Sequence, residues 1–389
     1  MMGNKWPVKQ LGDICEVLNG FAFKSDKYVD KGVRVIRITN VQHGYIEDNE
    51  PKFYPKNECD RLHQYMLKEN DLLMSLTGNV GRVGLLDGKY LPAALNQRVA
   101  CLRIKSDNVE LKYLFHHLNS ELFETRCIQS AKGIAQKNMS TEWLKEYPIP
   151  IPPLSEQARI VEELDQLSNI IEKKRQQLSE LDNLAQSIFY DMFGDPVTNE
   201  KGWEVKKLGE VGFFARGVSK HRPRNAPELM GGSMPLIQTG DVANSGMYIT
   251  DYNSTYSELG VQQSKVWEAG TLCITIAATI GKCSILTFDA CFPDSVVGYI
   301  GKKEFICNEY VYYLFGCLQS ILEANAPAVA QKNINLKVLN LLEVPLPPLE
   351  LQKLFAQKIE AIEKEKELIK QSIKETEELF NSRMDYYFG

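Results

Sequence analysis

The sequence of 389 residues has no long hydrophobic run and no closely spaced pair of cysteines. No uninterrupted apolar stretch approaches the roughly 20 residues that a helix needs to span a bilayer. The opening MMGNKWPVKQLGD lacks the apolar core of a secretory signal. Nine cysteines are an odd number and form no CxxC pair, which favours buried, reduced thiols over a disulfide framework or a zinc site. We therefore expect a cytoplasmic protein that makes no contact with membranes.

The sequence also lacks the motifs of the common enzyme classes. It contains no GxxxxGK(S/T) phosphate loop, no HExxH zinc motif and no EF-hand spacing. The proline pairs at 152–153 and 347–348 do not follow Asp or Asn, so the adenine-methyltransferase signature (D/N)PP(Y/F) is absent. Pro293-Asp294 is not followed by the (D/E)xK of a restriction nuclease core. The five histidines have no GxSxG serine, and the adjacent His116 and His117 are expected to be structural. These absences predict a chain that is not an enzyme and holds no metal.

Basic charge is not in excess. The chain has 45 Lys+Arg against 50 Asp+Glu, a formal net charge of −5. Residues 151–196 contain 4 basic and 9 acidic residues, whereas residues 1–150 contain 21 and 18. An acidic total argues against a strong, free-standing nucleic-acid binder.

The dominant positive feature is an internal duplication. The opening WPVKQLGDIC from Trp6 recurs as WEVKKLGEVG from Trp203. Further matches follow in the same order: VRVIRITNV (33–41) with MPLIQTGDV (234–242), LLMSLTGNVGRVG (72–84) with LCITIAATIGKCS (272–284), YLFHHL (113–118) with YLFGCL (313–318), AQKN (135–138) with AQKN (330–333), and PIPPL (150–154) with PLPPL (345–349). A chance similarity would not preserve this order, so the chain consists of two similar units.

Each unit ends in a long amphipathic stretch. Apolar residues between 155 and 194 recur at steps of three and four, the spacing of a coiled-coil seam, which only Lys174 interrupts. The seam returns 195 residues later, with Lys366 and Thr376 at the remaining positions. The seam residues are Leu164, Leu167, Ile171, Leu178, Leu181 and Ile188 in the first stretch and Ile359, Ile362, Ile369, Ile373 and Phe380 in the second. Neither helix can bury its seam alone, and the other helix is the expected partner.

Local signals mark the ends of the first long helix. Ser155 suits an N-cap, and Gly194-Asp195-Pro196 supplies a glycine and a proline that end a helix. Four apolar residues flank the seam and are expected to form a surface for partner proteins: Ile160, Ile170, Leu184 and Leu368.

The globular parts combine short β-branched runs with Gly, Asn and Asp turns, and one helix is expected near Glu110–Arg126. We predict an α+β fold: two similar domains, residues 1–150 and 197–348, joined by two long antiparallel coiled-coil helices, residues 151–196 and 349–389. Duplicated units usually pack about a pseudo-two-fold axis, as homodimers do.

Polar residues gather in the repeated turns of the first unit. Arg and Lys can donate to guanine O6 and N7, and Asn and Gln can pair with adenine N6 and N7, so these turns are candidates for reading DNA bases and phosphates. The alternative is a set of solvated turns. The candidates are Arg34, Arg37, Asn40, Gln42, His43, Thr77, Asn79, Arg82, Asn96, Gln97, Arg98, Lys132, Gln136 and Lys137.

The second unit offers a matching but different set. Its candidates are Gln238, Thr239, Asp241, Thr279, Lys282, Ser295, Gln331 and Lys332, with Lys220, Arg222 and Arg224 in a basic insertion expected to contact phosphates. The framework residues are kept, whereas Arg37, Asn40 and Arg98 of the first unit become Gln238, Asp241 and Ser295. Such divergence is expected of two domains that read two different sequences.

These motifs resemble those of specificity (S) subunits of type I restriction–modification systems, over the full length of the chain. The similarity rests on the WxVKxLG(D/E) openings, GFAFKS at Gly20–Ser25, AQKN before PIPPL or PLPPL, SEQARIVEELDQL at 155–167, and DMFGDP at Asp191–Pro196. The second unit departs from it with ARGVSK at 215–220, which offers no FKS match for the candidate Lys24, and with ELQK in place of SEQA.

The resemblance implies two target-recognition domains, each reading one half of a bipartite site in double-stranded DNA, with the helices fixing the gap between the halves. Methyltransferase (M) subunits would dock on the helices and supply S-adenosylmethionine chemistry. Motor–nuclease (R) subunits, where present, would bring ATP, Mg and cleavage. No cofactor is expected in this chain itself.

Two other functions remain open from the residues alone. One is a coiled-coil adaptor that binds proteins and no nucleic acid. The other is a single-chain nuclease or methyltransferase, which would need a cofactor loop that the sequence does not contain.

Overall fold

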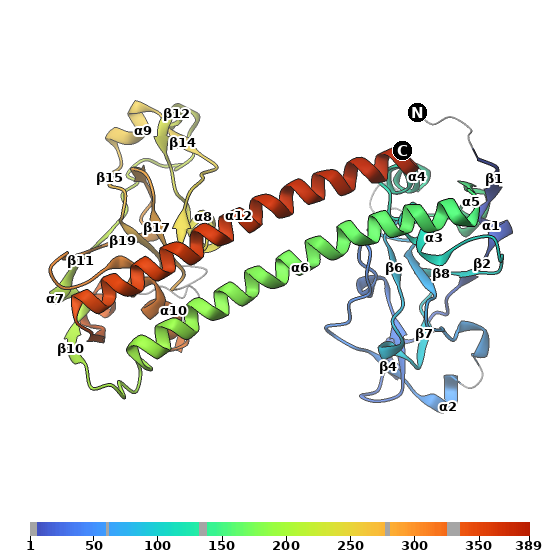
Figure 1. Ribbon diagram of the computed structural model, residues 1–389, viewed down its shortest axis with the longest axis horizontal. Helices are drawn as coiled ribbons and strands as arrows, with labels where there is room; N and C mark the ends of the chain where they lie inside the picture. Colours follow the sequence, from blue (N-terminus) through green and yellow to red (C-terminus); the bar gives the residue numbers. More distant parts are fainter. Residues whose placement is uncertain (1–5, 60–61, 132–137, 277–280, 325–334) are drawn as a thin grey trace. The chain divides into compact units, whose positions relative to one another are not determined.

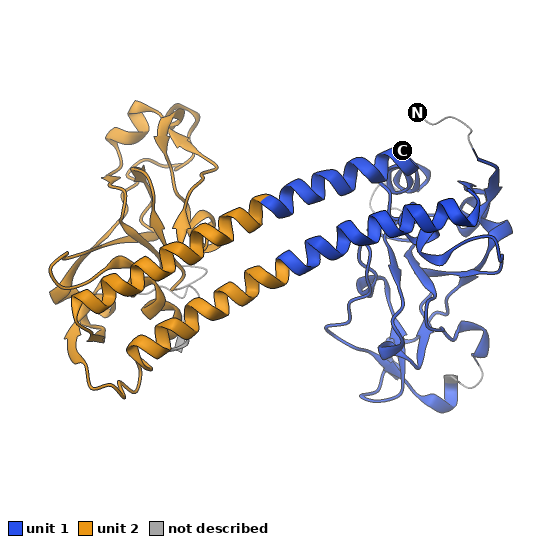
Figure 2. Ribbon diagram, in the orientation of Figure 1, with its two compact units in different colours: residues 1–174, 372–389 blue, residues 175–371 orange. Residues whose placement is uncertain are grey.

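The computed structural model describes residues 6–59, 62–131, 138–276, 281–324 and 335–389 (Figure 1). Contacts divide the chain into two compact units: unit 1 comprises residues 1–174 and 372–389, and unit 2 comprises residues 175–371 (Figure 2). Each unit holds one globular domain together with a stretch of each long helix, α6 (Leu154–Phe193) and α12 (Leu349–Phe388).

Unit 1 is built on a four-stranded antiparallel sheet of order β2-β8-β5-β6. A three-stranded sheet of order β4-β3-β7 and the pair β1-β9 complete it, and β3 runs parallel to β7. The strands are β1 (Val8–Gln10), β2 (Cys15–Asn19), β3 (Val33–Ile36), β4 (Phe53–Tyr54), β5 (Leu72–Ser75), β6 (Val83–Leu85), β7 (Ala93–Leu95), β8 (Val99–Ile104) and β9 (Pro148–Pro150). The short helices are α1 (Leu11–Ile14), α2 (Lys56–Cys59), α3 (Leu111–Leu118), α4 (Glu121–Ser130) and α5 (Thr141–Glu146), with 3-10 turns at Ser25–Lys27, Ile38–Asn40, His63–Tyr65 and Gly88–Tyr90.

Unit 2 repeats this plan with a five-stranded sheet of order β11-β19-β16-β17-β13, in which only β13 and β17 are parallel among the pairs described. The strands are β10 (Glu204–Lys207), β11 (Gly212–Arg216), β12 (Met230–Pro235), β13 (Tyr248–Ile249), β14 (Thr255–Tyr256), β15 (Val266–Trp267), β16 (Leu272–Thr275), β17 (Cys283–Leu286), β18 (Ala290–Cys291), β19 (Val296–Gly301) and β20 (Glu343–Leu346). The helices are α7 (Leu208–Val211), α8 (Thr239–Asn244), α9 (Glu258–Gln262), α10 (Asn308–Ala324) and α11 (Leu336–Leu341), with a 3-10 turn at Pro227–Leu229. The predicted α+β class and the duplication are confirmed.

The expected single helix at Glu110–Arg126 is wrong, because unit 1 has two helices there. Helix α3 ends at Leu118, and Ser120 caps α4 by accepting a hydrogen bond from the Phe123 amide at 3.3 Å. Serine competes with helical backbone hydrogen bonds and is favoured at the N-cap, so it separates the two segments.

Equivalent tyrosines show how the two units correspond. The Tyr113 hydroxyl donates to the Pro150 carbonyl at 2.9 Å, and the Tyr310 hydroxyl donates to the Pro345 carbonyl at 2.8 Å. The match of Tyr113 with Tyr313 in the sequence is therefore wrong by three residues. A shift of three residues is close to one helical turn and keeps the same face of the helix, so the pattern of apolar residues did not reveal the error.

A buried glutamine attaches each domain to its long helix. Gln157 is fully buried; its Oε1 accepts from the Glu110 amide at 2.8 Å, and its Nε2 donates to the Asn108 and Pro152 carbonyls at 2.9 and 2.8 Å. Gln352 makes the same three bonds in unit 2, with the Cys307 amide at 3.0 Å and the Phe305 and Pro347 carbonyls at 3.1 and 2.8 Å. Both glutamines lie in the first turn of a long helix, so each helix begins at a fixed position on its domain.

The ends of α6 are partly as expected. Ser155 is not the N-cap, because the helix begins at Leu154 and the Pro153 carbonyl already accepts from the Glu156 and Gln157 amides at 2.9 and 3.0 Å. Gly194 ends the helix with a φ of +76°, a conformation that favours glycine.

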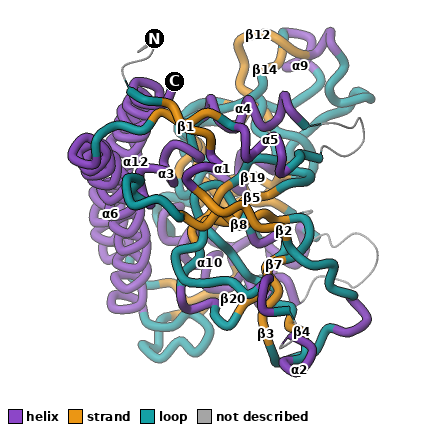
Figure 3. Tube along the Cα trace, turned by 90° about the vertical axis from the view of Figure 1, so that its right-hand side faces the viewer, coloured by secondary structure: helices purple, strands orange, loops and turns teal. Residues whose placement is uncertain are grey.

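Within each unit the stretches of α6 and α12 lie side by side and antiparallel (Figure 1, Figure 3). In unit 1, Ile160 and Leu164 near the start of α6 pack with Met384 and Phe388 near the end of α12. In unit 2, Phe189 near the end of α6 packs edge-to-face against Phe355 near the start of α12. None of the eleven seam residues is exposed.

The polar seam positions are paired within each unit. Lys174 donates to the Ser372 carbonyl and hydroxyl at 3.2 and 2.6 Å and to the Thr376 hydroxyl at 3.0 Å. Lys366 forms ion pairs of 2.7 Å with Asp182 and with Glu363. The interruptions of the apolar seam are thus hydrogen-bonded polar layers.

Three of the four flanking apolar residues are exposed: Ile170, Leu184 and Leu368. The fourth, Ile160, is fully buried in unit 1, so its assignment to a partner surface is wrong.

Candidate nucleic-acid interface

The ends of three strands bring separate turns of unit 1 together. The Leu76 amide donates to the Arg98 carbonyl at 3.0 Å, the Met139 amide to the Leu76 carbonyl at 2.9 Å, and the Gly44 amide to the Val83 carbonyl at 2.9 Å. These bonds place residues 42–44, 77–82 and 96–98 at one edge of the sheet, a group that we call turn cluster 1. Three groups of candidates that are distant in the sequence therefore form one surface.

Arg82 connects the side chains of turn cluster 1. Its Nη1 donates to Gln42 Oε1 at 2.8 Å, and its guanidinium lies 3.2 and 3.3 Å from the Asn79 carboxamide oxygen when that amide faces it. His43 is exposed and lies 3.9 Å from the Glu124 carboxylate.

The rest of turn cluster 1 offers further polar groups to solvent. Gln97 and Arg98 are exposed, and Asn96, whose Oδ1 accepts from the Arg98 amide at 3.3 Å, and Thr77 are half-buried. The surface thus combines guanidinium, carboxamide and imidazole groups, the donor and acceptor types that read base edges and phosphates.

Two candidate arginines of unit 1 make contacts within the domain. Arg34 pairs with Asp48, and its guanidinium lies over the rings of Phe53 and Tyr90 at 5.1 and 5.5 Å. Arg37 donates to the Glu50 carbonyl at 2.8 Å. These contacts assign both arginines a role in the frame that supports the turns. Lys24 lies apart from this frame, exposed before the 3-10 turn at Ser25–Lys27.

Asn40 and Asp241, a pair that differs between the units, are both parts of the frame. Asn40 is 3% exposed; its Oδ1 accepts from the Arg37 amide, and its Nδ2 donates to Asp48 Oδ1, both at 2.8 Å. Asp241 accepts from the Gln238 amide at 2.8 Å and from Asn253 Nδ2 at 2.7 Å. An Asn–Asp pair of unit 1 is thus an Asp–Asn pair in unit 2, and the exchange preserves the hydrogen bond. The contrast between Asn40 and Asp241 has a structural explanation that needs no difference in DNA sequence.

Unit 2 has an equivalent group, turn cluster 2, formed by residues 281–282 and 294–295, whereas residues 238–241 match residues 37–40 in the frame of unit 1. The Ile276 amide donates to the Ser295 carbonyl at 3.3 Å, as Leu76 does to Arg98 in unit 1. Gln238 and Lys282 are exposed, Thr239 and Ser295 are half-buried, and Lys282 Nζ lies 3.3 Å from Gln319 Oε1.

The basic insertion of unit 2 is fixed to the domain. The Lys220 and His221 amides donate to Gln263 Oε1 at 2.7 and 3.0 Å. Arg222 and Arg224 both pair with Asp294 of turn cluster 2, and all three side chains are exposed. The insertion therefore adds its guanidinium groups to this cluster.

Six candidates lie outside the described residues: Lys132, Gln136, Lys137, Thr279, Gln331 and Lys332.

The histidines and cysteines do not form a reactive site in the described part of the chain. His116 is buried and lies 2.9 Å from Asp165, and His117 is fully buried, with a pKa that desolvation lowers to about 4. Burial raises the pKa of Cys15 to about 12, and the cysteines whose side chains are described are free thiols. Among the described residues no group of three or more His, Cys, Asp or Glu side chains is placed to hold a metal ion, and no helix is long and apolar enough to cross a membrane.

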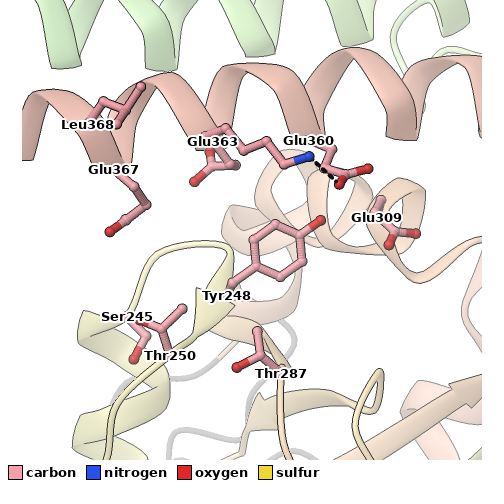
Figure 4. A pocket seen from close by; sticks show the side chains of 10 residues that line it. Ser245, Tyr248, Thr250, Thr287, Glu309, Glu360, Glu363, Glu367 and Leu368 are labelled. Carbon is pink, nitrogen blue, oxygen red and sulfur yellow. Dashed lines mark ion pairs between the residues drawn. The ribbon is translucent and has the colours of Figure 1, made fainter.

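The cavity of about 600 Å³ in unit 2 has the wrong charge for DNA. Figure 4 shows Tyr248 facing α12 among Glu309, Glu360, Glu363 and Glu367. Burial and then the carboxylates of Glu309, Glu360 and Glu363 raise the pKa of Tyr248. The cavity contains none of the candidate DNA contacts.

Sequence reasoning missed Asp294 and the two glutamines, Gln157 and Gln352, that attach the domains to the long helices. Gln157 and Gln352 stand 195 positions apart, as the seam residues do, so their recurrence in SEQA and ELQK was a usable signal. Nothing in the sequence connected Asp294 with the insertion about 70 residues before it, because folding alone brings them together.

Comparison with known proteins places these observations in a family. The chain matches the family described as type I restriction modification DNA specificity domain twice, over residues 3–183 and 200–378. It is 23% identical over 389 residues to the type I restriction enzyme EcoBI specificity subunit of Escherichia coli, covering 92% of this chain and 79% of the relative.

Two solved structures share the fold. A type I restriction–modification system S subunit from M. genitalium has a TM-score of 0.58 at 14% identity and covers 99% of this chain and 96% of its own. A chain from a study of complex assembly and conformational transition of the type I R-M system has a TM-score of 0.60 at 18% identity, covering 100% and 98%. The resemblance drawn from the sequence motifs is confirmed: the chain belongs to the family of type I restriction modification DNA specificity domains.

Proposed function

We propose that this chain is the non-catalytic specificity subunit of a type I restriction–modification complex, in which each globular domain reads one half of a bipartite DNA target. The observation that carries the proposal is a shared frame that presents different side chains. Turn clusters 1 and 2 occupy equivalent strand ends, and at matching positions unit 2 has Ser295 where unit 1 has Arg98, while Arg222 and Arg224 occur only in the insertion of unit 2.

The chemistry of these side chains suits double-stranded DNA. Guanidinium groups bind phosphates and guanine edges as bidentate donors, and carboxamides pair with adenine. A net charge of −5 makes the isolated chain a weak binder, so partner subunits are expected to contribute much of the phosphate contact.

The long helices suit two roles in the complex. Their exposed Ile170, Leu184 and Leu368 offer apolar surface for methyltransferase subunits. In this proposal the length of the helices sets the gap between half-sites. In this proposal S-adenosylmethionine belongs to the methyltransferase subunits, and ATP and Mg belong to motor–nuclease subunits where these are present.

The test is to express the chain with its own methyltransferase subunit and to sequence the methylome. The proposal requires a new motif with two defined halves. Arg98→Ala should relax only one half and Lys282→Ala only the other, so each variant is the control for its counterpart. No new motif, or one undivided motif, would refute the proposal.

A protein-binding adaptor is the second candidate, favoured by the exposed Leu184 and Leu368. The two functions differ in the response of DNA binding to salt. Binding of duplex DNA by the complex should weaken steeply as salt rises if the chain reads DNA. Absent or salt-insensitive binding would favour the adaptor.

A further inference from the structure

The two units carry positive charge at the same place by different routes. In unit 1, Arg98 stands in the turn before β8, and its carbonyl accepts the Leu76 amide. The matching hydrogen bond in unit 2 ends on Ser295, so unit 2 has no cation at that position and has Asp294, with the opposite charge, at the position before it. A carboxylate at this turn repels an approaching polyanion, so its presence calls for another structural role.

The ion pairs of Asp294 show what this role is. Arg224 Nη2 pairs with its Oδ1, and Arg222 Nη2 lies 3.5 Å from its Oδ2. Arg222 Nη1 also donates to the Ser219 and His221 carbonyls at 2.5 and 2.8 Å, which fixes the guanidinium against its own loop. One carboxylate therefore holds two guanidinium groups, and the three side chains together carry a net positive charge.

The insertion that bears these arginines is fixed at its base as well. Gln263 Oε1 accepts two of its amides, and Ser264 Oγ donates to the Val218 carbonyl at 2.6 Å. With the base of the insertion held, Asp294 orients the Arg224 guanidinium and adds a contact to the Arg222 guanidinium, which its own loop also holds. The side chains of Arg222, Arg224 and Asp294 are 54%, 43% and 41% exposed, so a ligand can reach them.

We propose that Asp294 is a positioning residue, which holds Arg222 and Arg224 over the turn before β19 so that they bind a DNA phosphate where unit 1 uses Arg98. The inference rests on the proposed function and adds a residue that determines affinity for the half-site of unit 2. Each guanidinium has five N–H donors, so pairing with Asp294 leaves donors for a phosphate.

The direction in which Asp294→Asn changes the affinity for DNA separates this role from simple charge repulsion. If Asp294 only repelled DNA, Asp294→Asn would tighten binding, because a negative charge is removed beside a polyanion. If Asp294 positions the arginines, Asp294→Asn weakens binding, because Arg224 loses the ion pair that orients it and Arg222 loses one of its contacts. Asp294→Glu keeps the carboxylate and should restore most of the affinity.

The experiment uses the full chain in complex with its methyltransferase subunits and a duplex that carries the modified motif. Dissociation constants are measured across a series of salt concentrations. Asp294→Asn should bind roughly tenfold more weakly, a fraction of what a charged hydrogen bond contributes. Its salt slope should fall by about one to two, since each neutralised phosphate contributes about 0.9 to that slope. Glu228→Gln removes the same charge beside the same insertion, 3.9 Å from His221, and is the matched control expected to bind as tightly as the wild type or more tightly.

A double-mutant cycle removes the ambiguity of a misfolded variant. In a chain with Arg222→Ala and Arg224→Ala, Asp294→Asn should have no further weakening effect, because Asp294 acts through these arginines. A second tenfold loss in that background would overturn the inference, as would Asp294→Asn binding that equals or exceeds the wild type. A wild-type complex that modifies no motif and binds no DNA would instead overturn the proposed function.

Discussion

Replacing the buried Gln157 by alanine should loosen the attachment of the first domain to α6. The side chain is fully buried and makes three hydrogen bonds, all to main-chain groups. Gln157→Ala leaves the Glu110 amide and the Asn108 and Pro152 carbonyls without this partner, and the contact with Pro152 is buried. Gln352→Ala makes the same change in unit 2.

The magnitude follows from the number of bonds. A neutral intramolecular hydrogen bond contributes about 1 kcal/mol net, so the loss of three costs about 3 kcal/mol before any cost of the cavity. Domains of this size are stable by about 5–15 kcal/mol, so the substitution removes a large share without abolishing folding.

Hydrogen exchange resolves the effect by unit. A cost of about 3 kcal/mol corresponds to roughly hundredfold faster exchange of protected amides, here in α3 (Leu111–Leu118) for Gln157→Ala. The peptides of unit 2 should not change, and Gln352→Ala should give the reverse pattern. Gln177→Ala, at an exposed position of α6, is the control and should leave both units unchanged. Equal protection of α3 in wild type and Gln157→Ala would refute the reasoning.

Three further outcomes are expected. Burial lowers the pKa of His117 from 6.5 to about 4, so between these pH values the unfolded chain binds a proton that the folded chain does not. The contribution of His117 to the free energy of unfolding should therefore fall by about 3 kcal/mol as the pH drops from 7 to 4. His117→Leu, which copies Leu314 of unit 2, should remove this component in denaturant titrations at the two pH values; an identical pH dependence would contradict it. Thr376→Val removes a hydrogen-bond acceptor from Lys174 and should lower the free energy of unfolding by about 1 kcal/mol. Adding Lys174→Met to this variant should restore its stability in thermal unfolding. A further loss of stability in the double variant would contradict the role of the polar layer. Inserting four residues after Leu178 lengthens α6 by about 6 Å and breaks the seam, so methylome sequencing should find a changed gap or no motif; an unchanged motif at full activity would show that the helix does not set the spacing.

The architecture was predictable because it repeats. The seam of α6 returns 195 residues later in α12, and a sequence that contains the same pattern twice shows both the duplication and the partner of each helix. Lys174 stood out as an interruption, but its bonds with Ser372 and Thr376 depend on the antiparallel pairing and needed the structure.

The candidate site was less predictable, because side chains of the same type serve the frame and the surface. Asn40 and Asp241 differ between the units, as contact residues would, yet each completes an Asn–Asp pair with a partner 8 or 12 residues away. Arg34 is a residue type that commonly contacts DNA, but its ion pair with Asp48 places it in the frame that supports the turns. Sequence position does not distinguish these cases, since the distinction depends on which groups meet after folding.

The buried glutamines that attach each long helix to its domain bond only to main-chain atoms. The carboxamides of Gln157 and Gln352 pair with carbonyls and amides that exist whatever side chains the domain carries. Mutations that alter the exposed turns therefore leave the joint with the helix intact. If each half reads DNA as proposed, a lineage of such proteins acquires new targets by changing turn residues in one half, while assembly and the other half stay as they were.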